Sequence, residues 1–280
     1  MRGLSPAIFS ALFILAFRPT FGWLAERFEA ADTFYSHGWL VPLASLWLIW
    51  KKRQFLKEIP RSPSFWGLAL VVASLAIHLA ATWLGIGFVS GFAMLGTLYG
   101  LIWTGYGWAT VRYIRFPLLF LLFMIPLPGV LLISMSFTMK LFAASLATSF
   151  IRFVGIPALH SGSTIQVPGI SVVVDDTCSG LRSLISLVAL ACLWTALMPA
   201  ASKGWQKLTV VVASLPIALV ANMVRIVALV LLSAIYGPQI AEGFIHYGSG
   251  FVVFGVALLG LSWLTRSLTQ WSLPSYGLKG

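Results

Sequence analysis

The sequence predicts an all-α integral membrane protein that crosses the bilayer several times, because three properties of its composition agree. Of the 280 residues, 59% are hydrophobic and 9% are charged, and the mean hydropathy is +0.96. A soluble domain needs many more polar residues to cover its surface. The net charge of +11 would suggest nucleic acid as the partner of a soluble protein. No cationic face with interleaved aromatic residues lies outside the apolar runs, however, which argues against nucleic acid.

About eight apolar runs approach the roughly 20 residues that a helix needs to cross the hydrocarbon core. The first two runs are short, so they require tilting or local thinning of the bilayer. Together the runs predict one integral membrane domain, residues 1–280, without a separate soluble domain. The predicted spans are Leu4–Phe17, His37–Trp50, Phe65–Leu84, Phe88–Val111, Phe116–Leu132, Leu181–Met198, Leu208–Ile235 and Tyr247–Leu264.

The charged residues predict the orientation of these spans, because lysine and arginine are retained in short cytoplasmic loops. Six of the seven carboxylates fall on one side of the predicted membrane, and only Glu58 lies on the other. Both termini are therefore expected in the cytoplasm. The side that contains Glu58 also collects 12 of the 18 cations: Arg2, Lys51, Lys52, Arg53, Lys57, Arg61, Arg112, Arg115, Lys203, Lys207, Arg266 and Lys279.

Two segments before the sixth span are expected to stay outside the bilayer. A crossing by Ser134–Val154 would reverse every later assignment, and its amphipathic pattern is typical of a short helix at the membrane surface or of one packed on the other spans. The β-branched run that follows is divided by Pro168-Gly169, which predicts a β-hairpin. Lipid cannot satisfy the edge of a hairpin, so we expect it on the extracytoplasmic side or against protein.

Three reactive side chains are expected at the same outer layer of the membrane. The hairpin leads to Cys178 at the mouth of the sixth span, and His246 opens the eighth. Arg225 follows Lys207 by 18 residues, or about 27 Å along a helix, which places it near the outer surface. Each residue alone has an ordinary explanation: a packing cysteine, an arginine that extends to the interface, and an interfacial histidine.

Acyl transfer is the chemistry that this combination favours. A thiolate is a nucleophile, a neighbouring cation or helix N-terminus lowers its pKa, and a fixed positive charge stabilises a tetrahedral oxyanion. We assign Cys178 as the nucleophile, His246 as general base and acid, and Arg225 as the oxyanion or thiolate stabiliser; the roles of the last two are interchangeable. Cys192 is expected to be a small core residue, too far along the same helix for a disulfide.

Supporting roles are expected for several polar neighbours, with Ser179 next to the nucleophile. Arg182 would contact a substrate carboxylate, or else an aspartate or backbone group nearby. Asp175 and Asp176 would orient His246 or Arg225, or lie solvated at the hairpin end.

Other polar residues carry weaker expectations. Asn222, one turn before Arg225, would hydrogen-bond across the bundle. His37 and Tyr35 would line the same cleft, although interfacial anchoring is the preferred explanation. His78 is expected to be a hydrogen-bonded contact between helices. The histidines and cysteines show no recognised metal-ligand spacing, and neither a metal nor a cofactor is expected.

With these residues the chain resembles the bacterial branch of the exosortase/archaeosortase family. The matching motifs are Cys178-Ser-Gly-Leu-Arg-Ser, Asn222-x-x-Arg225 and His246 before Gly-Ser-Gly. Tyr35-Ser-His-Gly and Phe123-Met-Ile-Pro-Leu-Pro also look like the family. The likeness extends from about residue 32 to about residue 255, with the catalytic segments at about 160–255.

The resemblance implies a thiol protease or transpeptidase of the bacterial inner membrane. Its substrates would carry PEP-CTERM sorting signals: a short motif of the Pro-Glu-Pro type, a transmembrane helix and a basic tail. An acyl-enzyme thioester would form at the extracytoplasmic surface, and either water or an amine, such as one on a lipid-linked acceptor, would resolve it. The partners implied are the signal helix and the lipid bilayer.

Two other classes of function remain as alternatives. A transporter would need polar residues at mid-membrane depth and paired broken helices, whereas most mid-span positions here are apolar. A non-catalytic scaffold for envelope or exopolysaccharide assembly would function without Cys178. A serine-type intramembrane protease is disfavoured, because Gly-x-Ser-x-Gly is absent from the sequence.

Overall fold

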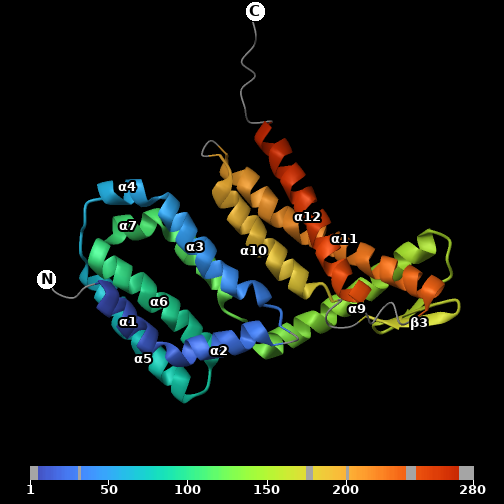
Figure 1. Ribbon diagram of the computed structural model, residues 1–280, viewed down its shortest axis with the longest axis horizontal. Helices are drawn as coiled ribbons and strands as arrows, with labels where there is room; N and C mark the ends of the chain where they lie inside the picture. Colours follow the sequence, from blue (N-terminus) through green and yellow to red (C-terminus); the bar gives the residue numbers. More distant parts are fainter. Residues whose placement is uncertain (1–5, 31–32, 175–178, 200–201, 238–243, 271–280) are drawn as a thin grey trace, which may run out of the picture. The chain divides into compact units, whose positions relative to one another are not determined.

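The computed structural model describes residues 6–30, 33–174, 179–199, 202–237 and 244–270. The chain divides into two compact units, Met1–Pro128 and Gly129–Gly280, which we call unit 1 and unit 2. Figure 1 shows that helices dominate both units and that the strands belong to unit 2. The protein is therefore a largely α-helical, multi-pass membrane protein, as the composition predicts.

Unit 1 begins with a bent pair of helices, α1 (Pro6–Ala16) and α2 (Arg18–Glu29). The segments Ile8–Ala16 and Arg18–Glu29 meet at 65°. Pro19 lies in the first turn of α2 and has no N–H to donate to the preceding turn, which explains a break at this point. The predicted span Leu4–Phe17 is thus only the first half of a longer broken element.

A buried histidine satisfies the polar groups that the break exposes. His78 is 4% exposed, and its Nε2 lies 3.0 Å from the Ala16 carbonyl at the end of α1. Its Nδ1 lies 2.8 Å from the Ser90 hydroxyl, which in turn lies 2.6 Å from that of Thr20. Because the carbonyl can only accept, Nε2 carries the proton in this network. The prediction that His78 is a hydrogen-bonded helix contact is confirmed.

The centre of unit 1 is an antiparallel pair of long apolar helices, α5 (Phe65–Trp83) and α6 (Gly87–Tyr106). Their backbones approach closely where Gly67 faces Thr104 and Gly100: a Cβ on Gly67 would lie 2.9 Å from the Gly100 carbonyl oxygen. Small residues at a helix crossing are typical of packing inside a membrane. Two predicted spans, Phe65–Leu84 and Phe88–Val111, correspond to this pair.

Shorter helices complete unit 1. The predicted span His37–Trp50 becomes a 3₁₀ turn, η1 (Ser36–Trp39), followed by the 12-residue helix α3 (Leu40–Lys51). The exposed helix α4 (Arg53–Glu58) follows α3, and α7 (Trp108–Tyr113) follows α6.

The predicted span Phe116–Leu132 is wrong as one continuous helix. It divides into α8 (Arg115–Phe120), η2 (Leu121–Met124) and the start of α9. Ile125, with ψ 112°, is extended because a residue before proline avoids the helical region, and Pro126 and Pro128 follow it. A hydropathy average does not register this interruption.

Unit 2 begins with α9 (Gly129–Phe153), whose 25 residues are long and apolar enough to cross a membrane. The helix predicted at Ser134–Val154 begins five residues earlier than expected, at Gly129, and its position at the membrane surface stays a prediction. One face of α9 is buried through small residues such as Ala143, Ala144 and Ala147. Phe142 and Phe153 are 50% and 86% exposed, so packing within unit 2 does not bury these apolar side chains of the amphipathic pattern.

A small antiparallel sheet follows, in the order β1 (Leu159–Ser161), β2 (Thr164–Val167) and β3 (Ile170–Val173). β2 and β3 pair around Pro168-Gly169, with Val167 opposite Ile170. β1 is an additional strand that the sequence does not predict. Ile165 is fully buried and belongs to a core cluster with α9 and α11. The sheet therefore packs against protein within unit 2.

Three helices form the remainder of unit 2: α10 (Leu181–Leu197), α11 (Gly204–Tyr236) and α12 (Phe244–Gln270). They share a core that includes Leu187, Val210, Ala218 and Leu261. The predicted spans Leu208–Ile235 and Tyr247–Leu264 lie within α11 and α12.

Eight spans are not confirmed. In the described ranges, five helices are long and apolar enough to cross a membrane, and the bent pair α1–α2 could count as a sixth. α10, with 17 residues, falls just short of that group. The five are α5, α6, α9, α11 and α12.

Candidate active site

The N-terminus of α10 is a tightly constrained turn. Gly180 precedes the helix with φ +82°, a left-handed conformation that favours glycine. Ser179 is fully buried, and its Oγ accepts a hydrogen bond from the Leu181 N–H at 3.4 Å. The Ser183 hydroxyl donates to the Gly180 carbonyl at 2.9 Å. Cys178, Asp175 and Asp176 lie outside the described residues, which resume at Ser179.

Asn222 of α11 packs directly on this turn. It is 4% exposed, and a Cβ on Gly180 would lie 2.7 Å from its Nδ2 and 2.8 Å from its Cγ. Such distances show that the amide and the Gly180 backbone are in close contact. The predicted role of Asn222 across the bundle is consistent with this position, and α10 and α11 pack together.

One turn further along α11, Arg225 contacts α12. Its Nε donates a hydrogen bond to the Ser249 hydroxyl at 3.0 Å, and its guanidinium carbon lies 3.9 Å from the position of a Cβ on Gly250. Residues three apart lie on the same face of a helix. The same face of α11 therefore contacts the turn before α10 through Asn222 and the first turns of α12 through Arg225.

His246 lies in the first turn of α12, but its side chain is outside what the structure describes. Ser249 follows it by three residues and so shares its helix face. Sequence reasoning did not single out Ser249, although its spacing from His246 was a usable signal. Arg182 is half-buried in the first turn of α10, where a cation opposes the helix macrodipole, so contacts other than the dipole determine its position.

We expect replacement of Gly180 by alanine to destabilise the protein by about 1–3 kcal/mol, the usual cost of a left-handed non-glycine residue. The added Cβ would also displace Asn222. Thermal unfolding of the purified protein in detergent measures the loss. Gly255→Ala is the matched control, because a Cβ there meets nothing within 4 Å; equal stability of the two variants would contradict the prediction.

The remaining predicted site residue, His37, belongs to a cluster in unit 1. Its ring stacks on Tyr35 at a centroid distance of 5.8 Å, and it makes a hydrogen bond with the backbone of Phe123. The Tyr35 hydroxyl accepts a hydrogen bond from the Leu127 N–H at 3.2 Å. The two family-like stretches of unit 1, 35–38 and 123–128, are therefore bound to each other.

Burial lowers the pKa of His37 below its ordinary 6.5, although the hydrogen bond to Phe123 opposes this shift. A lowered pKa in the folded state means that the neutral ring stabilises the fold above pH 6.5. This contribution is lost as the pH falls through the lowered pKa. We expect thermal stability to drop as the pH falls below about 6.5, and His37→Gln to reduce the drop. A pH dependence unchanged in His37→Gln would contradict this prediction.

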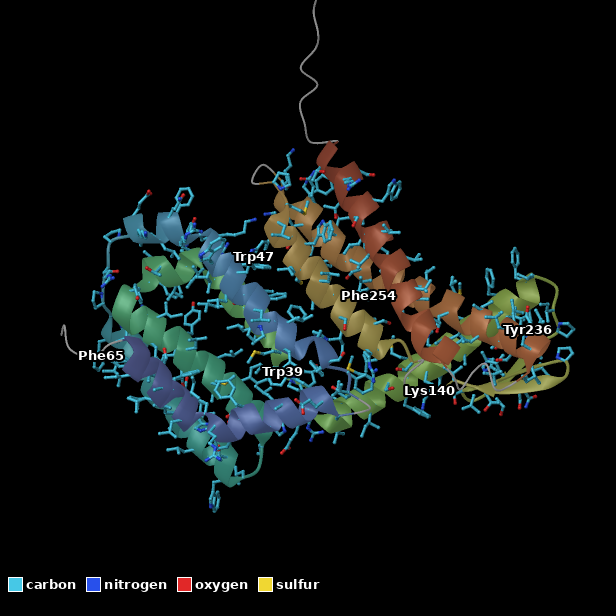
Figure 2. The ribbon with its side chains drawn as sticks, viewed as in Figure 1. Trp39, Trp47, Phe65, Lys140, Tyr236 and Phe254 are labelled. Atoms are coloured by element: carbon cyan, nitrogen blue, oxygen red, sulfur yellow. The ribbon has the colours of Figure 1, made fainter. Side chains whose placement is uncertain are left out.

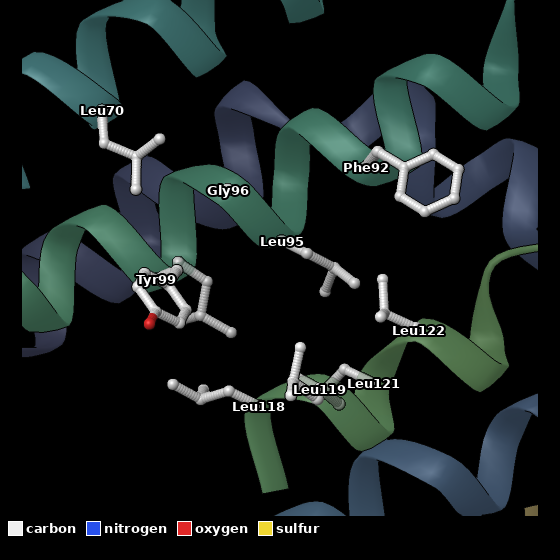
Figure 3. Close-up of a pocket in the computed structure, with 10 residues that line it drawn as sticks. Leu70, Phe92, Leu95, Gly96, Tyr99, Leu118, Leu119, Leu121 and Leu122 are labelled. Carbon is white, nitrogen blue, oxygen red and sulfur yellow. The ribbon is translucent and has the colours of Figure 1, made fainter. Parts of the chain in front are cut away.

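A half-open apolar cavity of about 200 Å³ also lies in unit 1 (Figure 3). Leucines of α5, α6, α8 and η2 line it, together with Phe92 and Tyr99. Catalytic pockets normally bring several polar groups together, and this cavity offers one phenol, so it is not a candidate active site. Within the described ranges, no three His, Cys, Asp or Glu residues form a metal-binding group.

Comparison with protein families finds a match to the model described as Transmembrane exosortase (Exosortase_EpsH). The match covers residues 23–263 and so includes the described parts of both units from α2 to α12. No curated protein and no solved structure matches the chain. Since the matched region spans most of the 280 residues, the chain belongs to the transmembrane exosortase family.

Proposed function

We propose that the protein is a cysteine-type peptidase or transpeptidase that cleaves C-terminal sorting signals of exported proteins. The observation that carries the proposal is the pair of contacts made by one turn of α11. Asn222 touches Gly180, two residues after Cys178, and Arg225 binds Ser249, three residues after His246. These contacts support convergence of the three candidate catalytic residues at one place in unit 2.

In the proposed mechanism, the Cys178 thiolate attacks the carbonyl carbon of the scissile peptide bond. The carbonyl oxygen becomes an oxyanion, which Arg225 stabilises, because a guanidinium held at Nε presents its terminal nitrogens as a planar fork. His246 donates a proton to the departing amine, and the C–N bond breaks to leave a thioester on Cys178. His246 then accepts a proton from water or an acceptor amine, which attacks the thioester and regenerates the thiolate.

The proposed substrate carries a short motif of the Pro-Glu-Pro type, a transmembrane helix and a basic tail. Its helix would lie in the bilayer beside unit 2, and its motif would reach the outer surface at the start of α10. Arg182, in the first turn of α10, is the proposed contact for the motif carboxylate. Asp175 and Asp176 are proposed to orient His246 or Arg225.

We further propose that the protein lies in the bacterial inner membrane with both termini in the cytoplasm. The distribution of cations and carboxylates along the chain supports this orientation. Gly180 and Asn222 would then lie at the outer surface. Lys207, near the start of α11, would lie at the inner one, about 27 Å from Arg225 along the helix.

Co-expression with a reporter tests the function. The reporter carries the proposed signal, and the control reporter has the same helix and tail without the Pro-Glu-Pro motif. We expect the first reporter alone to be shortened, and mass spectrometry of its new C-terminus to identify water or an amine as the acceptor. Equal processing of both reporters would contradict the proposal. Absence of any processing, while the protein is present in the membrane, would also contradict it and favour a transport or scaffold role.

A further inference from the structure

A concentration of positive charge at one end of unit 1 is not used by the proposed catalytic mechanism. Glu58 of α4 is the one carboxylate among these cations in the described sequence 51–115. All six side chains that we group as the basic end are exposed: Lys51, Arg53, Lys57, Arg61, Arg112 and Arg115.

Packing of the long helices explains why these residues meet, although 64 positions separate the first from the last. α5 and α6 are antiparallel and cross closely at Gly67, so the start of α5 and the end of α6 lie at the same end of unit 1. Arg61 precedes α5, and Arg112 and Arg115 follow α6. A hydrogen bond from Ser62 N–H to the Tyr106 carbonyl, 3.3 Å long, joins the two segments.

α3 and α4 are attached to the same end through Lys52. Its Nζ donates a hydrogen bond to the Tyr113 carbonyl at 3.0 Å and lies 4.8 Å from the centre of the Tyr113 ring. This contact places Lys51, Arg53 and Lys57 near α7, in agreement with the positions of α4 and α7 in Figure 1. The basic end is therefore assembled from two stretches of chain, 51–61 and 112–115.

Aromatic side chains hold several of these cations in place. The guanidinium of Arg53 lies 4.0 Å from the centre of the Trp50 ring, and that of Arg61 lies 5.2 Å from the centre of the Tyr106 ring. Lys51 lies over Trp47 at 4.7 Å. These rings are themselves exposed, between 42% for Trp47 and 56% for Trp50 (Figure 2). Exposed rings and cations together suit the boundary between headgroups and acyl chains.

We infer that the basic end binds the headgroups of anionic phospholipids. Both α5 and α6 are candidate membrane spans, and their ends at Phe65 and Tyr106 place the cations at headgroup depth. Phosphate accepts bidentate hydrogen bonds from arginine, and four of the six cations are arginine. The exposed Trp50, Phe55 and Phe65 would contact the upper acyl chains, which a soluble anion or a nucleic acid does not possess. This inference does not depend on the catalytic proposal.

The test uses the full-length protein and the variant Lys57→Gln/Arg112→Gln, whose exposed side chains come from α4 and α7. Thermal unfolding is followed in nanodiscs of phosphatidylcholine with increasing phosphatidylglycerol. We expect phosphatidylglycerol to raise the unfolding temperature of the wild type. Because each cation near an anionic surface contributes about 1 kcal/mol, loss of the two should weaken the affinity of the protein for phosphatidylglycerol roughly 30-fold.

The matched control is Lys207→Gln/Arg266→Gln, which removes two cations of unit 2 expected on the same side of the membrane. It should respond to phosphatidylglycerol like the wild type. The inference is overturned if both double variants respond alike, because diffuse attraction would then suffice. It is also overturned if phosphatidylcholine alone or soluble glycerol phosphate stabilises the wild type as much as phosphatidylglycerol does.

Discussion

Replacement of Cys178 by alanine is expected to reduce processing of the sorting-signal reporter by a factor of at least about 1000, because it removes the nucleophile of the proposed reaction. Cys178→Ser should be nearly as inactive, since a serine hydroxyl is a much weaker nucleophile at neutral pH without dedicated activation. Time courses of reporter cleavage in membranes, at matched protein levels, give the ratio. The wild type should also form a covalent adduct with the reporter that hydroxylamine releases.

Cys192→Ala is the control for the loss of a thiol as such. Cys192 is half-buried within α10, between Leu181 and Leu197, and its substitution should leave processing within about twofold of the wild type, as small volume changes usually do. If Cys178→Ala processed the reporter normally, thioester catalysis would be wrong. Loss of processing in both variants would indicate damage to α10 instead.

Hydropathy predicted α5, α6, α11 and α12 well because their apolar runs end at clear boundaries. α5 begins at Phe65, directly after a stretch with Arg61 and Pro63, and ends at Trp83. Hydropathy failed to predict helices that contain many polar residues. α2 carries Arg27, Glu26 and Glu29 and is still helical, since helices need backbone hydrogen bonds and not apolar side chains. A drop in hydropathy therefore marked the end of the apolar run and not the end of the helical structure.

In the segment 116–132 the error was the opposite one: hydropathy predicted one continuous helix where prolines interrupt it. Its side chains are continuously apolar, so a composition average treats it as one span. Pro126 and Pro128 remove two backbone donors within three residues, and the chain is extended at Ile125. The next helix, α9, begins directly after Pro128, at Gly129. The two prolines, weighed above hydropathy, predict the start of α9 correctly.

The sequence predicts a depth for the candidate site but not the rotation of its helices. Counting 18 residues from Lys207 predicts that Arg225 lies near one membrane surface, and this prediction does not depend on the neighbouring helices. Which neighbour Arg225 contacts depends on the rotation of α11 about its axis, and packing determines that rotation. The contact of Asn222 with Gly180 therefore emerged only from the structure, as did the hydrogen bond between Arg225 and Ser249.

Replacement of Arg225 by alanine is expected to lower kcat/KM for the reporter on the order of 100–1000-fold, the usual effect of losing an oxyanion donor. Arg225→Lys should recover little of this activity, because an ammonium lacks the Nε–H that binds Ser249 and cannot form a planar fork. Ser249→Ala should lower kcat/KM about tenfold, because the guanidinium loses the hydrogen bond that holds it in position. Ser249→Thr, which keeps the hydroxyl, should retain the activity of the wild type. Kinetics with a purified substrate peptide in detergent provide these ratios.

A purely structural role for Arg225 makes different predictions. In that case the alanine variant would lose folded protein, and the remaining folded fraction would process substrate at the normal rate. Active-site titration with a thiol-reactive substrate analogue separates the two cases by counting competent enzyme. Arg266→Ala is the control, because Arg266 is exposed on α12, 17 residues after Ser249, where it can affect net charge but not the reacting atoms. Normal turnover per titrated site in Arg225→Ala would rule out oxyanion stabilisation by this residue and leave His246 as the candidate for that role.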